Sequence, residues 1–279
     1  MKMQESGFLP ADDGAKLYWQ GVRPESETRG LVLISHGLGE HIARYDHLAA
    51  FLAEKKFAVF GPDHRGHGRS DGRRGHVLAF DRYLRDFKIF RDDTVARFPG
   101  QKIFLLGHSL GGLIAVHYAL AHPADFDCLV LSSAALKVKI EASPLKLALG
   151  RFFSKVIPGL SMSNGLDPNM ISHDPEVVKK YIDDPLVHDR VSARWYTSFI
   201  SAIAEAQARA GEMKMPALVM QSGEDRLVDP EGAREFFQKL GSPDKTLKYW
   251  EGFYHEMFNE VEKAKVYQFL LDWLEKHLA

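Results

Sequence analysis

The chain has 279 residues, of which 45% are apolar and 26% charged, a composition that excludes a disordered or fibrous protein. Its 36 basic and 37 acidic side chains give a formal net charge of −1, which argues against a nucleic-acid binder because such a protein needs a basic face. The single cysteine, Cys128, excludes an internal disulfide and allows a reducing compartment. With no visible signal peptide and no apolar run of roughly 18 residues, the sequence predicts a cytoplasmic protein.

Short apolar runs alternate with helical patterns along most of the chain. Two edge strands are expected first, around a turn at residues 12–14, followed by a turn region at residues 21–30. Apolar runs then predict buried strands at residues 31–35, 57–60, 103–106, 128–131 and 217–220, with a last strand at 246–250. Helical periodicity predicts helices at residues 41–55, 80–98, 113–122, 231–240 and 261–278. This alternation is typical of an α/β fold with a mostly parallel sheet wrapped by helices.

One interval breaks the alternation. Roughly eighty residues separate the strand at 128–131 from the strand at 217–220, and a simple crossover needs far fewer. The interval contains Phe152, Trp195 and Phe199 among other apolar residues, so it is not a disordered linker. We therefore expect a helical cap at residues 135–214, inserted between two parts of one core, residues 1–134 and 215–279.

The run from Gly107 to Gly112 (GHSLGG) contains the pattern G-x-S-x-G between a predicted strand and a predicted helix. In that context the serine lies on a sharp strand-to-helix turn that exposes its hydroxyl at the sheet edge. The helix N-terminus behind it stabilises developing negative charge. Ser109 is therefore the predicted nucleophile.

A nucleophilic serine needs a base that is oriented by an acid, and in this architecture they follow in the order serine, acid, histidine. His255 is the predicted base because it lies in a loop directly after the last strand. Three carboxylates compete for the acid after the strand at 217–220. Asp225 is favoured because it comes first after the turn glycine, whereas Asp229 resembles a helix N-cap before Pro230 and Glu224 is expected to be solvated.

The oxyanion formed during acyl transfer needs preorganised N–H donors. The residue after the nucleophile, Leu110, is expected to supply one and Leu38, in the glycine-rich loop after the strand at 31–35, the other. Pairs of histidines, His36 with His41 and His64 with His67, invite a metal-site interpretation. They lack the H-E-x-x-H helical spacing, and no nucleotide-binding glycine motif occurs, so no metal and no cofactor is expected.

Together, the segments GHSLGG (107–112), HGLGEH (36–41) and PDHRGHGRS (62–70) resemble the α/β-hydrolases of the monoacylglycerol lipase group. Residues 222–227 and 252–255 resemble that group's acid and histidine turns, and residues 181–186 resemble a segment of its cap. The resemblance implies an α/β-hydrolase fold and a serine hydrolase that cleaves a small lipid ester, a monoglyceride, into fatty acid and glycerol. It implies the same triad and oxyanion donors, and it places Glu40, His108 and Tyr181 at the alcohol side of the substrate.

Several alternatives share these residues. A broader carboxylesterase, a lysophospholipase or an acyltransferase would use the same triad. A non-catalytic binding module on the same scaffold is disfavoured because every member of the triad is present in order.

The first part of the predicted cap has helical amphipathic spacing at Leu145, Leu149, Phe152, Phe153 and Val156. Basic residues accompany this face, namely Lys137, Lys139, Lys146, Arg151 and Lys155, with Glu141 the only acid among them. One interpretation is a helix packed on the core with a solvated basic side. The other is a face that rests on a membrane or micelle while covering an acyl tunnel, because basic amphipathic helices bind anionic interfaces.

Overall fold

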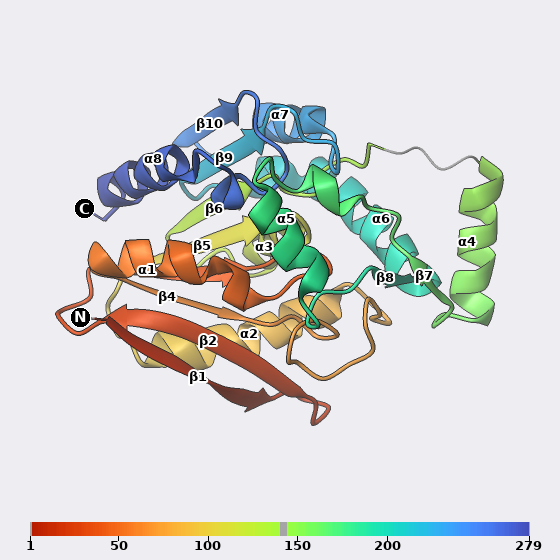
Figure 1. Cartoon of the computed structure of the whole chain (residues 1–279), viewed down its shortest axis with the longest axis horizontal. Helices are drawn as coiled ribbons and strands as arrows, with labels where there is room; N and C mark the ends of the chain where they lie inside the picture. Colours follow the sequence, from red (N-terminus) through yellow and green to blue (C-terminus); the bar gives the residue numbers. More distant parts are fainter. Residues whose placement is uncertain (1, 140–143, 279) are drawn as a thin grey trace.

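The computed structural model describes residues 2–139 and 144–278, with the backbone alone at residues 2 and 144–149. Its centre is an eight-stranded sheet in the order β1-β2-β4-β3-β5-β6-β9-β10 (Figure 1). The strands are β1 (Lys2–Pro10), β2 (Lys16–Pro24), β3 (Gly30–Ser35), β4 (Phe57–Pro62), β5 (Ile103–His108), β6 (Cys128–Ser132), β9 (Ala217–Ser222) and β10 (Lys245–Trp250). β2 pairs antiparallel with β1 and β4, and the remaining neighbours are parallel. The predicted α/β class with a mostly parallel sheet is confirmed.

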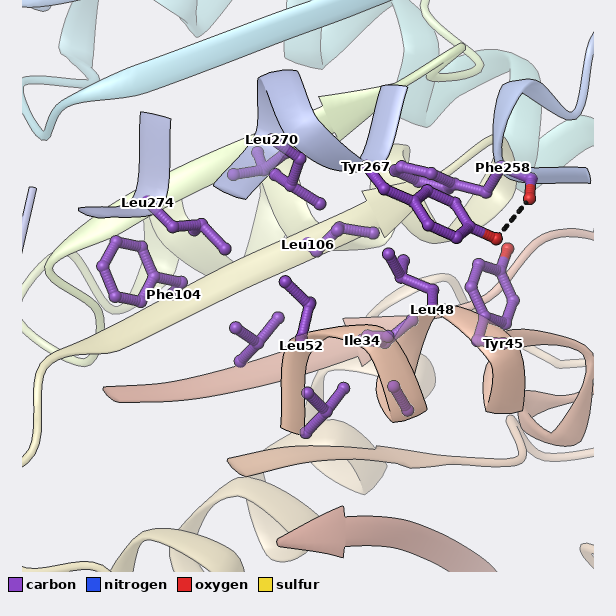
Figure 2. Packing of buried hydrophobic residues seen from close by; sticks show 14 of the residues in the cluster. Ile34, Tyr45, Leu48, Leu52, Phe104, Leu106, Phe258, Tyr267, Leu270 and Leu274 are labelled. Atoms are coloured by element: carbon purple, nitrogen blue, oxygen red, sulfur yellow. Dashed lines mark hydrogen bonds between the residues drawn. The ribbon is translucent and has the colours of Figure 1, made fainter. Parts of the chain in front are cut away.

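Helices cover both faces of the sheet (Figure 1). They are α1 (Asp46–Glu54), α2 (Asp81–Ala96), α3 (Leu110–Ala121), α7 (Pro230–Lys239) and α8 (Lys263–Lys276), with short 3-10 turns η1 (Ile42–Tyr45) and η4 (Met257–Asn259). α1 and α8 form one hydrophobic cluster with the sheet, and α2, α3 and α7 form another on the opposite face. Figure 2 shows Leu48 and Leu52 of α1 facing Leu270 and Leu274 of α8 beside β5. The loop after β3 leads into α1 and the loop after β10 leads towards α8, so each loop is joined to a helix that is packed on the sheet.

The expected turn region at residues 21–30 is wrong in its first part, because β2 continues to Pro24. Gly21 pairs with Phe60 of β4, and a Cβ atom added at Gly21 would lie 2.2 Å from the Phe60 ring. Glycine and proline usually mark turns. Here the glycine instead leaves room for the Phe60 ring of the neighbouring strand, which the sequence pattern does not reveal.

The insertion, residues 133–216 between β6 and β9, is mostly helical and lies beyond the carboxyl ends of the parallel strands (Figure 1). It contains α4 (Pro144–Val156), η2 (Pro168–Met170), α5 (Pro175–Asp183), α6 (Ala193–Arg209) and η3 (Ala210–Glu212). A small antiparallel pair, β7 (Ser161–Ser163) and β8 (Arg190–Ser192), was not predicted, because three-residue strands leave no periodic signal. α6 packs on α3, and α4 projects at the far end of the molecule (Figure 1). Across residues 2–139 and 144–278, no helix combines the length and apolar character needed to cross a bilayer.

Candidate active site

Ser109 lies at the turn between β5 and α3 with φ 52° and ψ −120°, a backbone conformation that costs a non-glycine residue about 1–3 kcal/mol. The Ser109 N–H donates to Ser132 O at 3.1 Å, and the Ala135 N–H donates to Ser109 O at 2.9 Å. A Cβ atom at Gly107 would lie 2.5 Å from Gly111 O, so this close approach requires glycine. The two backbone hydrogen bonds, and the close approach that Gly107 allows, therefore hold Ser109 in its strained conformation at the N-terminus of α3.

His255 and Asp225 lie together although thirty residues separate them in the sequence. The His255 Nδ1–H donates to Asp225 Oδ2 at 2.7 Å, and both side chains are buried. Asp225 Oδ1 accepts hydrogen bonds from the Leu227 and Val228 N–H groups at 2.9 and 3.0 Å. The imidazole is thus fixed with its proton on Nδ1 and has no hydrogen bond at Nε2 from the described residues, and His255 lines the same two cavities as Ser109.

Asp225 and His255 also shift each other's pKa. Burial alone would lower the pKa of His255, but the Asp225 carboxylate outweighs it and raises that pKa above the usual value. Burial would raise the pKa of Asp225, but the charge and hydrogen bond of His255 outweigh it and hold that pKa below its ordinary range. Asp225 is therefore a stable anion beside an imidazole of increased basicity.

The two competing carboxylates have other positions. Asp229 caps α7, and its side chain accepts from the Glu231 N–H at 3.0 Å. Glu224 is exposed to solvent. Of the three acids after β9, the structure brings Asp225 to His255.

Leu38 and Leu110 line a cavity together with Ser109, and their backbone N–H groups have no hydrogen-bond acceptor among the described residues. The neighbouring Gly37 N–H is already engaged, because it donates to Glu40 Oε1 at 2.5 Å. Leu110 opens α3, whose first N–H groups have no partner within the helix. The loop and the helix thus each present one free donor beside the serine.

His108, Glu40 and Tyr181 all line one cavity with Ser109, but they differ in what they present to it. His108 Nδ1 donates to Ser132 O at 3.0 Å, which leaves its Nε2 as an acceptor. Burial lowers the pKa of His108 to about 3, so the ring is neutral. Glu40 is 2% exposed, and both its oxygens already accept hydrogen bonds, one from Tyr45 and one from Arg44.

Arg44 and Glu256, which the sequence analysis did not single out, connect the site. The Arg44 guanidinium donates two bonds to Glu256 at 2.5 and 2.6 Å and one to Glu40 at 2.9 Å, and it lies 4.7 Å from the centre of the Tyr181 ring. Burial raises the pKa of Glu40 more than Arg44 lowers it, whereas at Glu256 the attraction of Arg44 outweighs burial and lowers the pKa. A charged residue in an amphipathic pattern is usually solvated, so Arg44 gave no signal in the sequence. The acid directly after His255 was the available clue.

Two cavities of different character meet at Ser109 and His255. One, of about 300 Å³, is lined by apolar and polar side chains from the core loops and α5, the polar ones including His108, Tyr181 and Glu256. It is the more polar of the two and is called the polar cavity. The other, of about 230 Å³, is lined mostly by apolar side chains, including Leu110, Val191, Trp195 and Phe199. The arrangement offers one reacting hydroxyl to a molecule with an apolar end and a polar end.

The histidines considered as metal ligands have other partners. His36 donates from Nδ1 to Gly37 O at 2.8 Å and accepts from the His64 N–H at 2.9 Å. His64 Nε2 bonds Ser35 Oγ at 3.0 Å, and His41 Nε2 lies 2.8 Å from Asp184 Oδ2. In the described part of the chain no three ligating side chains are arranged to hold a metal ion.

The predicted amphipathic face of the insertion is described only in part. The side chains of Leu145 and Leu149, with Lys146 and Glu141, lie outside the described residues. Phe152 and Val156 are each 58% exposed, and Phe153 is half-buried. The apolar side of α4 therefore faces solvent at these positions.

Comparison with known proteins agrees with this geometry. The model of a hydrolase family described as serine aminopeptidase S33 matches residues 26–262. The chain is 34% identical to a monoacylglycerol lipase of Mycolicibacterium smegmatis, covering 95% of each, and 33% identical to the monoglyceride lipase of Rattus norvegicus, covering 94% of this chain and 86% of the relative. The crystal structure of the Paleococcus ferrophilus monoacylglycerol lipase is similar with a TM-score of 0.85 at 37% identity, covering 94% of this chain and 99% of that one. The chain belongs to the monoacylglycerol lipase-like group of α/β-hydrolases and is a serine ester hydrolase.

Proposed function

We propose that this protein hydrolyses monoacylglycerols to fatty acid and glycerol through an acyl-enzyme on Ser109. The observation that carries the proposal is the meeting of an apolar cavity and a more polar one at Ser109 and His255. A monoacylglycerol has these two ends, joined by the ester bond that must reach the serine. Relatives named as monoacylglycerol lipases over nearly the whole chain support the same substrate.

In this proposal His255 is the general base and Asp225 orients it. The His255 Nε2 takes the Ser109 proton as the hydroxyl attacks the ester carbonyl, and Asp225 stabilises the imidazolium that forms. The imidazolium then gives its proton to the departing glycerol oxygen. A water activated by His255 attacks the acyl-enzyme, which releases the fatty acid and restores Ser109.

The Leu38 and Leu110 N–H groups are the proposed oxyanion donors. Both are free of protein acceptors in the described structure, and both belong to elements that other bonds hold in place. Donors fixed in advance stabilise the developing charge without reorganisation, and the loss of one such donor typically costs about 100-fold or more in rate.

The acyl chain is placed in the apolar cavity, against Trp195 and Phe199 of α6. The Trp195 indole N–H donates to Tyr83 OH at 3.0 Å, and its ring stacks on Phe199 with centres 4.8 Å apart. These two contacts fix the orientation of the Trp195 ring. Each buried methylene contributes about 0.8 kcal/mol, so the length of the cavity discriminates among acyl chains.

The glycerol is placed in the polar cavity. His108 Nε2 is an acceptor there because Ser132 fixes the ring's proton on Nδ1. Tyr181 contributes a hydroxyl from α5, and burial raises its pKa, so it remains a donor. Glu40 acts mainly by holding the Gly37 N–H and thereby the loop that carries Leu38.

Residues 135–214 form the proposed cap over this site. Its outer part exposes the apolar side chains of Phe152, Val156, Ile157 and Met162, and α4 also exposes the basic residues Arg151 and Lys155. Such a surface suits contact with a membrane or micelle that holds the substrate. Flotation with anionic liposomes would show co-migration of the protein, and a protein that stays at the bottom of the gradient contradicts the contact.

Direct assay of the purified protein tests the activity. We expect release of glycerol from 1-monooctanoylglycerol, labelling of Ser109 by a fluorophosphonate, and faster turnover of this ester than of a short p-nitrophenyl ester. An amino-acid p-nitroanilide serves as the control for the peptidase activity that the family description names. Turnover of the anilide in preference to the glycerol ester would overturn the proposal.

A further inference from the structure

The polar cavity at Ser109 is lined by five carboxylates, those of Glu40, Asp167, Asp184, Asp189 and Glu256. Among the described residues that line it there is no lysine or arginine. Two of its histidines are neutral at pH 7, because burial lowers the pKa of His108 to about 3 and that of His188 to about 4.

Only part of this negative charge is compensated. Arg44, behind the lining, is shared by Glu40 and Glu256, so these three groups together carry a charge between zero and −1. His41 bonds to Asp184 at 2.8 Å. Asp167 accepts hydrogen bonds from Asn169 and carries no ion pair in the described structure.

Asp189 is the clearest source of uncompensated charge. Its carboxylate is exposed at the cavity and has no hydrogen-bond or ion-pair partner among the described residues. Among the described residues that line the apolar cavity on the other side of Ser109 there is no carboxylate, and the one cationic residue among them, Lys139, donates to the Asp225 backbone carbonyl at 3.0 Å. The whole chain has a formal net charge of only −1, so the field at the polar cavity arises locally.

We propose that the alcohol side of this site selects its leaving group by charge, taking esters of neutral alcohols and of cationic amino alcohols and rejecting esters whose alcohol carries a phosphate. The inference rests on the proposed ester hydrolysis at Ser109 and names the alcohols that this site releases. In each case the acyl–oxygen bond breaks, and the alcohol leaves with a proton from His255.

The physical basis is Coulombic. In the proposed reaction a charge on the leaving alcohol lies within the cavity that these carboxylates line for the whole of the acylation step. Attraction of a cation and repulsion of an anion then act in opposite directions on kcat/KM, and both weaken as salt screens the exposed aspartates. A neutral glycerol ester is insensitive to this field.

Three esters with one acyl chain separate the effect from acyl recognition: octanoylcholine, 1-monooctanoylglycerol and 1-octanoylglycerol 3-phosphate, each below its micellar concentration. At low ionic strength we expect kcat/KM for the choline ester to exceed that for the phosphate ester by at least about tenfold. Raising the salt to about 1 M shortens the screening length to about 3 Å and should reduce this ratio severalfold.

Variants of Asp189 test the source of the field. Asp189→Asn should reduce the cation-to-anion ratio by about fivefold and Asp189→Lys by about 25-fold. The matched control is Asp272→Asn on α8, an exposed carboxylate far from the site whose loss changes the net charge of the chain equally. It should leave the ratio within twofold of wild type.

Equal kcat/KM for the cationic and anionic esters at low salt, or a ratio that Asp189→Lys does not change, would overturn the charge selection. The glycerol ester distinguishes this result from failure of the proposed function. A protein that cleaves 1-monooctanoylglycerol but ignores head-group charge contradicts this inference alone, whereas one that cleaves none of the esters contradicts the proposed function.

Discussion

The two cavities that meet at Ser109 are built by different means. The polar cavity is framed by buried ion pairs and hydrogen bonds, with Arg44 joining Glu40 and Glu256. The apolar cavity is framed by packing, with Trp195 and Phe199 supplied by α6. Ion pairs in a buried site require fixed geometry, whereas apolar walls tolerate substitutions of similar volume. We therefore expect the alcohol side to be rigid and the acyl side to be adjustable.

The insertion shows the same division. Its segment around η2 and α5 is tied to the catalytic loops: the Glu256 N–H donates to Ile171 O at 2.8 Å, Ser172 Oγ donates to Asn259 O at 3.0 Å, and the His188 N–H donates to Gly39 O at 2.9 Å. α4, by contrast, packs mainly on α6 and exposes Phe152. The part of the insertion that lines the polar cavity is thus bonded to the core, whereas the outer part of the insertion is free to differ.

The largest effect is expected at the point that both cavities share. Ser109→Ala should lower kcat by about 10³–10⁶-fold, since removal of the nucleophile leaves only the oxyanion donors and binding. Circular dichroism and the thermal midpoint should show an intact fold. Retention of near-wild-type esterase activity by the alanine variant would remove Ser109 from the mechanism.

The pH profile tests the proposed role of His255 as the general base. In that mechanism the neutral imidazole is the active form, and Asp225 raises its pKa, so kcat/KM should fall as pH decreases through a value above that of free histidine. Asp225→Asn should cost about 10⁴-fold in kcat and move this acid limb to lower pH. Asp229→Asn is the matched control, and a shift there equal to that of Asp225→Asn would contradict the assignment.

Arg44→Ala tests whether ion pairs hold the alcohol side. Removal of the guanidinium leaves Glu40 and Glu256 buried without a counter-charge, so the free energy of unfolding should fall by about 3–5 kcal/mol. Urea denaturation measures it. Arg85→Ala removes an exposed pair with Asp81 on α2 and should cost about 1 kcal/mol or less. Equal losses for the two variants would show that the buried network contributes no special stability.

Trp195→Ala tests the adjustable side. Loss of the indole enlarges the apolar cavity, so the optimal acyl chain should lengthen by several carbons, and octanoyl esters should lose about tenfold in kcat/KM through lost contact. Rates on a series of monoacylglycerols below their micellar concentrations measure the shift. Phe152→Ala, an exposed aromatic in the same insertion, should leave the profile unchanged; a similar shift there would place the acyl chain elsewhere.

The smallest effect concerns the strained turn itself. Ser109→Gly should be about 1 kcal/mol more stable than Ser109→Ala, because glycine adopts the positive φ of this position without a Cβ penalty. Thermal unfolding of the two inactive variants compares them directly. An alanine variant as stable as the glycine variant would show that the turn stores no strain.

Local sequence patterns predicted the scaffold well, because buried parallel strands are continuous apolar runs and the strand-to-helix turn at Ser109 has a short motif. The same reasoning chose Asp225 over Asp229, since a residue before proline at a helix start has its own role as a cap. The ion pair of Arg44 and Glu256 could not be predicted, because the two residues are more than two hundred positions apart and neither belongs to a periodic pattern. Gly21 was wrongly interpreted as part of a turn, because the sequence does not distinguish a turn glycine from a strand glycine that accommodates a neighbouring ring.

The structure of an octylphosphonate adduct on Ser109 would test the central claim most directly. We expect the alkyl chain to lie in the cavity lined by Trp195 and Phe199, with the phosphonyl oxygen within hydrogen-bond distance of the Leu38 and Leu110 N–H groups. A chain that instead runs beside His108 and Tyr181, with its oxygen away from both donors, would contradict the division of the site into an acyl side and an alcohol side.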